Sequence, residues 1–220
     1  MRTMHPSVLR ALLPALLLAA AACADATGSP AHDVGGEYVG ELDTPYLAEG
    51  AALIDLISPD IREVSAPGRI FAARGVTERT LRIMVVNNPH VPAIGGPIVF
   101  HVRMPSGVAP PRSSVVAVAS PENDARSFAG GYQVRWRRVT PSPSFALAPG
   151  GAPRRQTDPA PIPFARLIDP LFPGGVPLNG PEVILADGRG NANKIFDLGD
   201  VRGYLYQYPD QIPPATVWSR

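Results

Sequence analysis

The stretch Tyr132-Gln133-Val134-Arg135-Trp136-Arg137 is the clearest strand signal in this sequence of 220 residues. Its apolar residues alternate with polar ones, and a period of two places the apolar side chains on one face of a β-strand. The stretches 98–104 and 81–85 repeat the alternation. Strands with one buried face are typical of an antiparallel sheet that packs against a second layer.

Short apolar runs of the same kind fill the chain between Gly36 and Thr140. Further strands are expected at 37–42, 51–57, 62–65, 69–73 and 114–119. Turn signals such as Ser58-Pro59-Asp60 and Gly95-Gly96-Pro97 separate them. Seven or eight short strands at this spacing, without a long helical pattern, predict a mainly β chain with an antiparallel β-sandwich over 36–140.

Composition limits the size and the partners of this protein. With 45% hydrophobic and 18% charged residues, the chain is long enough for one domain with appendages. Its 21 glycines and 27 prolines exclude a mostly helical protein. A formal net charge of +1 provides no field that would attract nucleic acid or an anionic membrane surface.

The first 22 residues have the layout of a secretory signal. Arg2 and Arg10 precede the apolar run 11–22, and no acidic residue interrupts it. The run is too short for a membrane-spanning helix, which needs about 20 apolar residues. Cys23, the only cysteine, follows three alanines at the expected cleavage point.

This arrangement resembles the lipobox of bacterial lipoproteins, although Ala20 stands where that family prefers leucine. The resemblance implies that the Cys23 thiol carries a diacylglycerol and that the new amino terminus is acylated, for example with palmitate. It also implies a permanent anchor in the cell envelope. Ala24 is not acidic, which favours the outer membrane in this family. The alternative is an ordinary secretory signal that has a cysteine near its cleavage point by chance.

Residues 23–35 are expected to form a disordered tether.

The predicted sandwich is similar in strand number and order to cohesin-like modules, and a generic immunoglobulin-like sandwich explains the same pattern. A proline-rich range, 141–181, follows the sandwich and is predicted to be an extended linker. Part of it is too apolar for a free linker. We expect five of its residues to dock on the sandwich, namely Phe164, Leu167, Ile168, Leu171 and Phe172.

The range 182–220 contains the most informative motif. Asn191 and Asn193 stand at alternate positions, and Asp197 and Asp200 follow at the start of an amphipathic pattern. Calcium binds six to eight oxygens, which one such loop can supply. An alternative is a metal-free turn in which Asp197 caps a helix that carries Leu198, Val201 and Leu205.

The motif resembles the calcium loop of dockerin repeats, of which this chain has one copy. The resemblance implies a calcium site formed by Asp187, Asn191, Asn193, the carbonyl of Ile195, Asp197 and Asp200. Two positions depart from the family. Arg189 stands at the first loop position, so Asp187 serves only in a longer loop, and Lys194 stands at the sixth, where glycine makes a turn with positive φ.

The sequence contains no nucleophile elbow, zinc-binding His-Glu-x-x-His or phosphate-binding loop. His90 and His101 are expected at the surface, with no carboxylate nearby in sequence. These observations favour a non-enzymatic lipoprotein that binds or scaffolds an envelope protein or a second copy of itself. The alternatives are a purely structural envelope protein and a polysaccharide-binding accessory protein. The latter would use exposed aromatic residues such as Tyr204, Tyr206, Tyr208 and Trp218.

Overall fold

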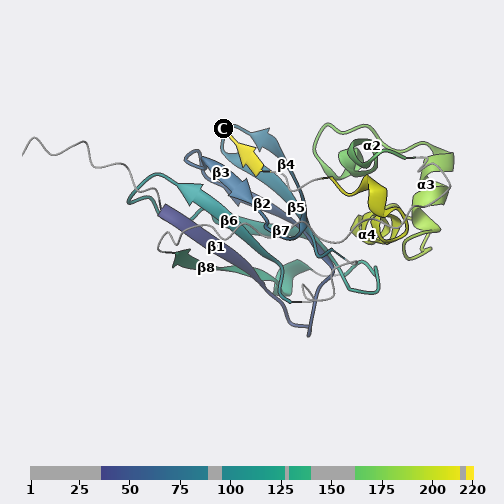
Figure 1. Cartoon of the computed structure of the whole chain (residues 1–220), viewed down its shortest axis with the longest axis horizontal. Coiled ribbons are helices and arrows are strands. Elements are labelled where there is room, and N and C mark those ends of the chain that lie inside the picture. Colours follow the sequence, from purple (N-terminus) through teal and green to yellow (C-terminus); the bar gives the residue numbers. More distant parts are fainter. Residues whose placement is uncertain (1–35, 89–95, 127–128, 140–161, 214–216) are drawn as a thin grey trace, which may run out of the picture. The chain divides into compact units, whose positions relative to one another are not determined.

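Two antiparallel sheets form the body of the computed structural model, which describes residues 36–88, 96–126, 129–139, 162–213 and 217–220 (Figure 1). Sheet A has the strand order β8 (Gln133–Val139), β1 (Gly36–Asp43), β6 (Val99–Met104), β3 (Glu63–Ser65) and β9 (Val217–Ser219). Sheet B has the order β4 (Ile70–Thr77), β5 (Thr80–Val86), β2 (Ala51–Ile57) and β7 (Arg112–Ala119). The prediction of a mainly β chain with a sandwich of antiparallel sheets is therefore confirmed.

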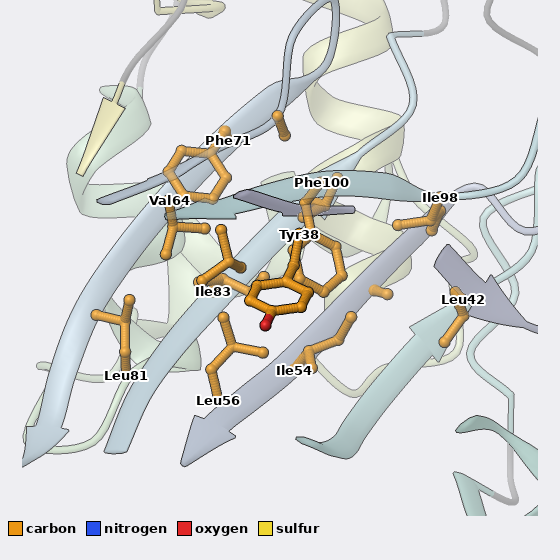
Figure 2. Packing of buried hydrophobic residues seen from close by; sticks show 14 of the residues in the cluster. Tyr38, Leu42, Ile54, Leu56, Val64, Phe71, Leu81, Ile83, Ile98 and Phe100 are labelled. Atoms are coloured by element: carbon orange, nitrogen blue, oxygen red, sulfur yellow. The ribbon is translucent and has the colours of Figure 1, made fainter. Parts of the chain in front are cut away.

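The two sheets enclose the first hydrophobic cluster, which the alternating residues supply. Figure 2 shows Tyr38, Ile54 and Phe100 from three different strands within it. Phe100 and Trp136 meet edge to face, with ring centroids 5.5 Å apart. Gly40 lies against both rings, because a Cβ there would be 2.5 Å from Phe100 Cζ and 2.9 Å from Trp136 Cζ3. A glycine is therefore needed for the rings to pack beside β1.

Sheet B also buries much of its outer face, which the strand pattern did not reveal. Met84 and Val86 are fully buried there, together with Leu53 of β2. The covering elements are α2 (Phe164–Ile168), η3 (Asp169–Leu171), α3 (Gly180–Asp187) and α4 (Leu198–Gln207). The short 3-10 helix η4 (Pro209–Gln211) follows α4. A further short 3-10 helix is η2 (Ala129–Gly131). The strand β5 is therefore buried on both faces. The alternation at 81–85 predicted one solvent-exposed face, but helices pack on that face.

The run Ala51–Ile57 shows how one strand serves both layers. Its residues alternate between the first cluster, as Ile54 does, and the helix-covered face, as Leu53 does. Asp55 is the polar exception on the outer face, where its carboxylate lies 2.7 Å from Arg82 Nε. Next to this pair, Arg74 of β4 reaches Asp169 of η3 at 2.7 Å. Apolar contact and ion pairs together hold the helices to sheet B.

The chain after β8 is divided between the two clusters. Leu167, Ile168 and Phe172 are buried in the second cluster, with Phe164 and Leu171 packed against it. β9 instead pairs with β3, and Trp218 packs against the first cluster. Residues 35–220 form one compact unit. The expected signal 1–22, the tether 23–35 and residues 141–161 of the predicted linker lie outside the described residues.

We predict that the helices are required for the stability of the whole unit. Leu167→Ala removes a fully buried side chain of α2 and should lower the free energy of unfolding by about 2–5 kcal/mol. Ile184→Ala in α3, where the side chain is 74% exposed, should change it by less than about 0.5 kcal/mol. Urea unfolding followed by fluorescence and circular dichroism measures both. Separate transitions for helices and sheets would contradict this prediction.

Candidate functional site

The loop 188–197 joins α3 to α4, and its end is a helix cap. Asp197 Oδ1 accepts a hydrogen bond of 2.7 Å from Gly199 N, and Asp200 Oδ2 accepts one of 2.8 Å from Asp197 N. These bonds form a capping box at the start of α4. The predicted cap by Asp197 is therefore confirmed, and Leu198, Val201 and Leu205 are buried behind it.

The polar side chains of the motif come together in this loop. Asn191 Nδ2 and Asn193 Nδ2 donate to Asp197 Oδ2 over 3.1 and 2.9 Å. Asp200 Oδ1 accepts from Asn191 N at 3.3 Å, and Asp187 Oδ1 accepts from Lys194 N at 3.0 Å. The structure thus gathers the five side chains that the sequence motif singled out. The sixth residue, Ile195, lies in the same turn with its side chain 68% exposed.

The backbone of the loop has the left-handed turn expected of a calcium loop. Lys194 has φ of 69°, although it replaces the glycine that the loop resemblance called for. The carbonyl oxygens of the two asparagine side chains accept from the backbone two residues ahead. Asn191 Oδ1 accepts from Asn193 N at 3.2 Å, and Asn193 Oδ1 from Ile195 N at 2.7 Å. Lys194 thus takes the required conformation without glycine.

Three carboxyl groups, those of Asp187, Asp197 and Asp200, meet at this loop. Asp200 is fully buried, and this burial raises the pKa of its carboxyl group to about 6. Nearby Asp197 and Asp187 add to the rise, while backbone N–H groups of Asp197 and Asn191 oppose it. The ion pairs within the described ranges include none of these three aspartates. A bound cation would offset the repulsion among these three carboxyl groups.

The donor types fit calcium, which prefers carboxylate, amide and carbonyl oxygens. Across the described ranges, no group of three or more His, Cys, Asp or Glu side chains is placed to hold a metal ion. A calcium site would therefore depend on Asn191 and Asn193 as well as on the aspartates. Both amides now direct Nδ2 at Asp197, and a half-turn of an amide exchanges its nitrogen and oxygen.

The loop is also packed directly against the sandwich. Asn191 Nδ2 donates to the carbonyl of Asn123 at 3.1 Å, and Arg202 Nη1 donates to Asn123 Oδ1 at 2.6 Å and to the Pro121 carbonyl. A Cβ at Gly199 would lie 1.7 Å from the Asn123 carbonyl oxygen. No side chain fits there, so α4 begins in direct contact with the loop that follows β7. The sequence motif did not indicate Asn123 or Arg202.

A buried carboxylate fixes the neighbouring loop 44–50. Glu49 is 3% exposed, and its side chain accepts from Tyr132 Oη at 2.7 Å, Thr44 Oγ1 at 2.9 Å and Arg126 Nε at 3.2 Å. Burial and the adjacent Glu49 raise the pKa of the Tyr132 hydroxyl. We call the three loops 44–50, 120–126 and 188–197 the loop end. Sequence reasoning missed this cluster, because Glu49 and Arg126 are 77 positions apart.

Other candidate residues lie away from the loop end or are buried. His101 pairs with Glu37 across sheet A at 3.0 Å, so it has a carboxylate partner that is remote in sequence. Tyr204 is fully buried and Tyr208 is 6% exposed, which contradicts their expected exposure. Trp218 is partly buried, whereas Tyr206 is 56% exposed. His90 and Cys23 lie outside the described residues.

Comparison with known proteins finds no relative of this chain. No family model matches the chain, and no curated protein or solved structure matches it. The assignment of the loop therefore depends on its own residues and geometry.

We predict that the carboxyl group of Asp200 titrates with a pKa near 6 in the metal-free protein, well above 3.8. The folded state then binds an extra proton between about pH 4 and 6, so the free energy of unfolding should fall as pH rises through this range. Nuclear magnetic resonance of the carboxyl carbon measures the midpoint, with Asp200→Asn identifying the signal. A midpoint near 4 would contradict the role of burial.

Proposed function

We propose that this chain is a non-enzymatic lipoprotein, anchored in the outer membrane through Cys23, whose β-sandwich binds another envelope protein. The placement of Cys23 directly after a short apolar run supports the anchor. Among the described residues, no helix has the length and apolar character needed to span a membrane. Attachment in this proposal therefore depends on lipid at Cys23.

Calcium in the loop 188–197 is the second part of the proposal. The observation that carries it is the meeting of Asn191 and Asn193 amides with Asp197, next to the buried Asp200 and with Lys194 in the left-handed conformation. Asp187, Asn191, Asn193, Ile195, Asp197 and Asp200 would hold the ion. The ion would pair with the carboxylates of Asp187, Asp197 and Asp200, and so stabilise the contact of the loop with Asn123.

The loop end supports protein binding as the function of the sandwich. Leu47 is fully exposed there, Ile195 is 68% exposed and Tyr46 is 51% exposed, with the Arg126 guanidinium stacked 4.1 Å from the Tyr46 ring centroid. Exposed apolar and aromatic side chains on a rigid base are typical of protein interfaces. The burial of Tyr204 and Tyr208 removes the main support for polysaccharide stacking.

We predict saturable calcium binding to the chain from Ala24 onward, which retains the whole compact unit. Affinity should lie in the weak extracellular range, about 10⁻⁴ to 10⁻³ M, because two ligands are neutral amides. Calorimetric titration measures it, and Asp197→Asn with Asp200→Asn should abolish it. Asp210→Asn, outside the loop, is the matched control and should bind normally.

Calcium should also raise the unfolding temperature of the unsubstituted chain by mass action. No heat at millimolar calcium, with an unchanged unfolding temperature, would contradict the metal site. The loop would then act as a metal-free cap, and the purely structural alternative would gain support.

We further predict that the lipidated full-length chain contacts an envelope protein through the loop end in the cells that produce it. A photo-crosslinking residue in place of Leu47 should give a discrete adduct, which mass spectrometry identifies. The same residue in place of Glu78, exposed at the turn between β4 and β5, is the control. Equal adducts at both sites, or none at Leu47, would argue against a binding role for the loop end.

A further inference from the structure

The free edges of the two sheets differ in how they resist pairing with another chain. In the described residues, sheet B ends at β4 and β7, and sheet A ends at β8 and β9. The register of β4 shifts between Gly75 and Thr77, and that of β7 shifts opposite Leu53 and Ile54. β9 has only three residues. Bulges and short edge strands are devices that prevent strand addition.

β8 has neither of these devices. It has seven residues and pairs with β1 in one unbroken register from Glu37↔Val139 to Asp43↔Gln133. Figure 1 shows β8 at the border of its sheet, beyond β1. Its backbone pairs with β1 along the whole strand, and the Trp136 ring packs on Phe100. The edge is therefore regular, which suits a peptide that binds as an additional strand.

The positive charge of β8 favours an acidic chain as the one that pairs with its open edge. Arg135, Arg137 and Arg138 are all exposed, and Arg137 and Arg138 form no ion pair within the described residues. A second copy of β8 would bring like charges together, which is unfavourable in a cross-strand pair. On its inner side β8 already meets an acidic strand, because Arg135 contacts Asp43 of β1 at 2.8 Å. Arg137 lies on the same face of β8 as Arg135, and it has no carboxylate partner among the described residues.

We propose that the open edge of β8 binds an extended acidic peptide of a partner protein by antiparallel or parallel strand addition. Main-chain hydrogen bonds to β8 supply the attachment, and carboxylates at alternate positions of the peptide pair with Arg135 and Arg137. The chain's own following segment, 140–161, is a poor competitor. It carries six prolines, which lack the N–H needed for a ladder, and two arginines but only one acidic residue. The proposal is independent of the calcium loop and of the loop end.

The test uses the chain from Ala24 onward and a synthetic heptapeptide with glutamate at alternate positions and valine between them. Binding is followed by amide shifts and hydrogen exchange of residues 133–139. We expect the peptide to protect amides of β8 that exchange rapidly in the free protein. A peptide with lysine in place of glutamate should not bind. A glutamate peptide methylated at alternate backbone nitrogens keeps every charge but loses ladder donors, and it should not bind either.

Protein variants locate the site. Arg137→Glu should weaken binding about five- to tenfold, because an exposed attraction becomes a repulsion. Arg112→Glu, on the bulged edge strand β7, is the matched control and should leave binding unchanged. Both variants alter exposed side chains, and circular dichroism verifies that each is folded.

Four results would overturn the proposal. These are no binding at millimolar peptide, equal binding of the methylated peptide, an unchanged affinity of the Arg137→Glu variant, and protection of all β8 amides before peptide is added. The last would mean that another part of the chain, or a second copy, already occupies the edge. None of these results bears on calcium binding or on cross-linking at Leu47, so failure of this proposal is distinguishable from failure of the proposed function.

Discussion

Burial of both faces of sheet B is the constraint on which the rest of this structure depends. Its inner face packs on sheet A, and its outer face carries Leu53, Met84 and Val86, which need a second cover. Exposing such side chains costs about 25 cal/mol per Å² of apolar surface. The helices after residue 162 provide this cover. The chain then continues to β9, which pairs with β3 of sheet A. The helices are consequently part of the fold and not an attached module.

The position of the candidate calcium loop follows from that cover. Once α4 lies on sheet B, its first turn faces the loop after β7, and Gly199 allows backbone contact with Asn123. The Asn191 bond to Asn123 and the Arg202 bonds to Asn123 and Pro121 then join helix and sandwich. A cation bound among these groups would act on the sandwich itself. Metal binding and the stability of the loop end would therefore be linked.

The surfaces left open differ in chemistry. The loop end combines exposed Leu47 and Tyr46 with a buried Glu49 that holds its base rigid. The β8 edge combines an unbroken register with exposed arginines, which discourage self-association and suit the acidic strand that we propose. Sheet B has no comparable edge in the described residues, because both its border strands are bulged. Because the two surfaces differ in chemistry, they would suit different partners in the binding function that we propose.

The sequence by itself determined the local features of this protein. Alternation at 132–137 identified β8, and Asp197 before an apolar pattern identified the cap of α4, because both signals lie within a few residues of chain. Tertiary structure alone decided that Met84 is buried, that Tyr204 is core, and that Glu49 meets Arg126. Such contacts join residues far apart in sequence, and periodicity shows that a face is apolar or polar without showing what will cover it. The same reason explains why the motif predicted the residues of the candidate site but not its packing on Asn123.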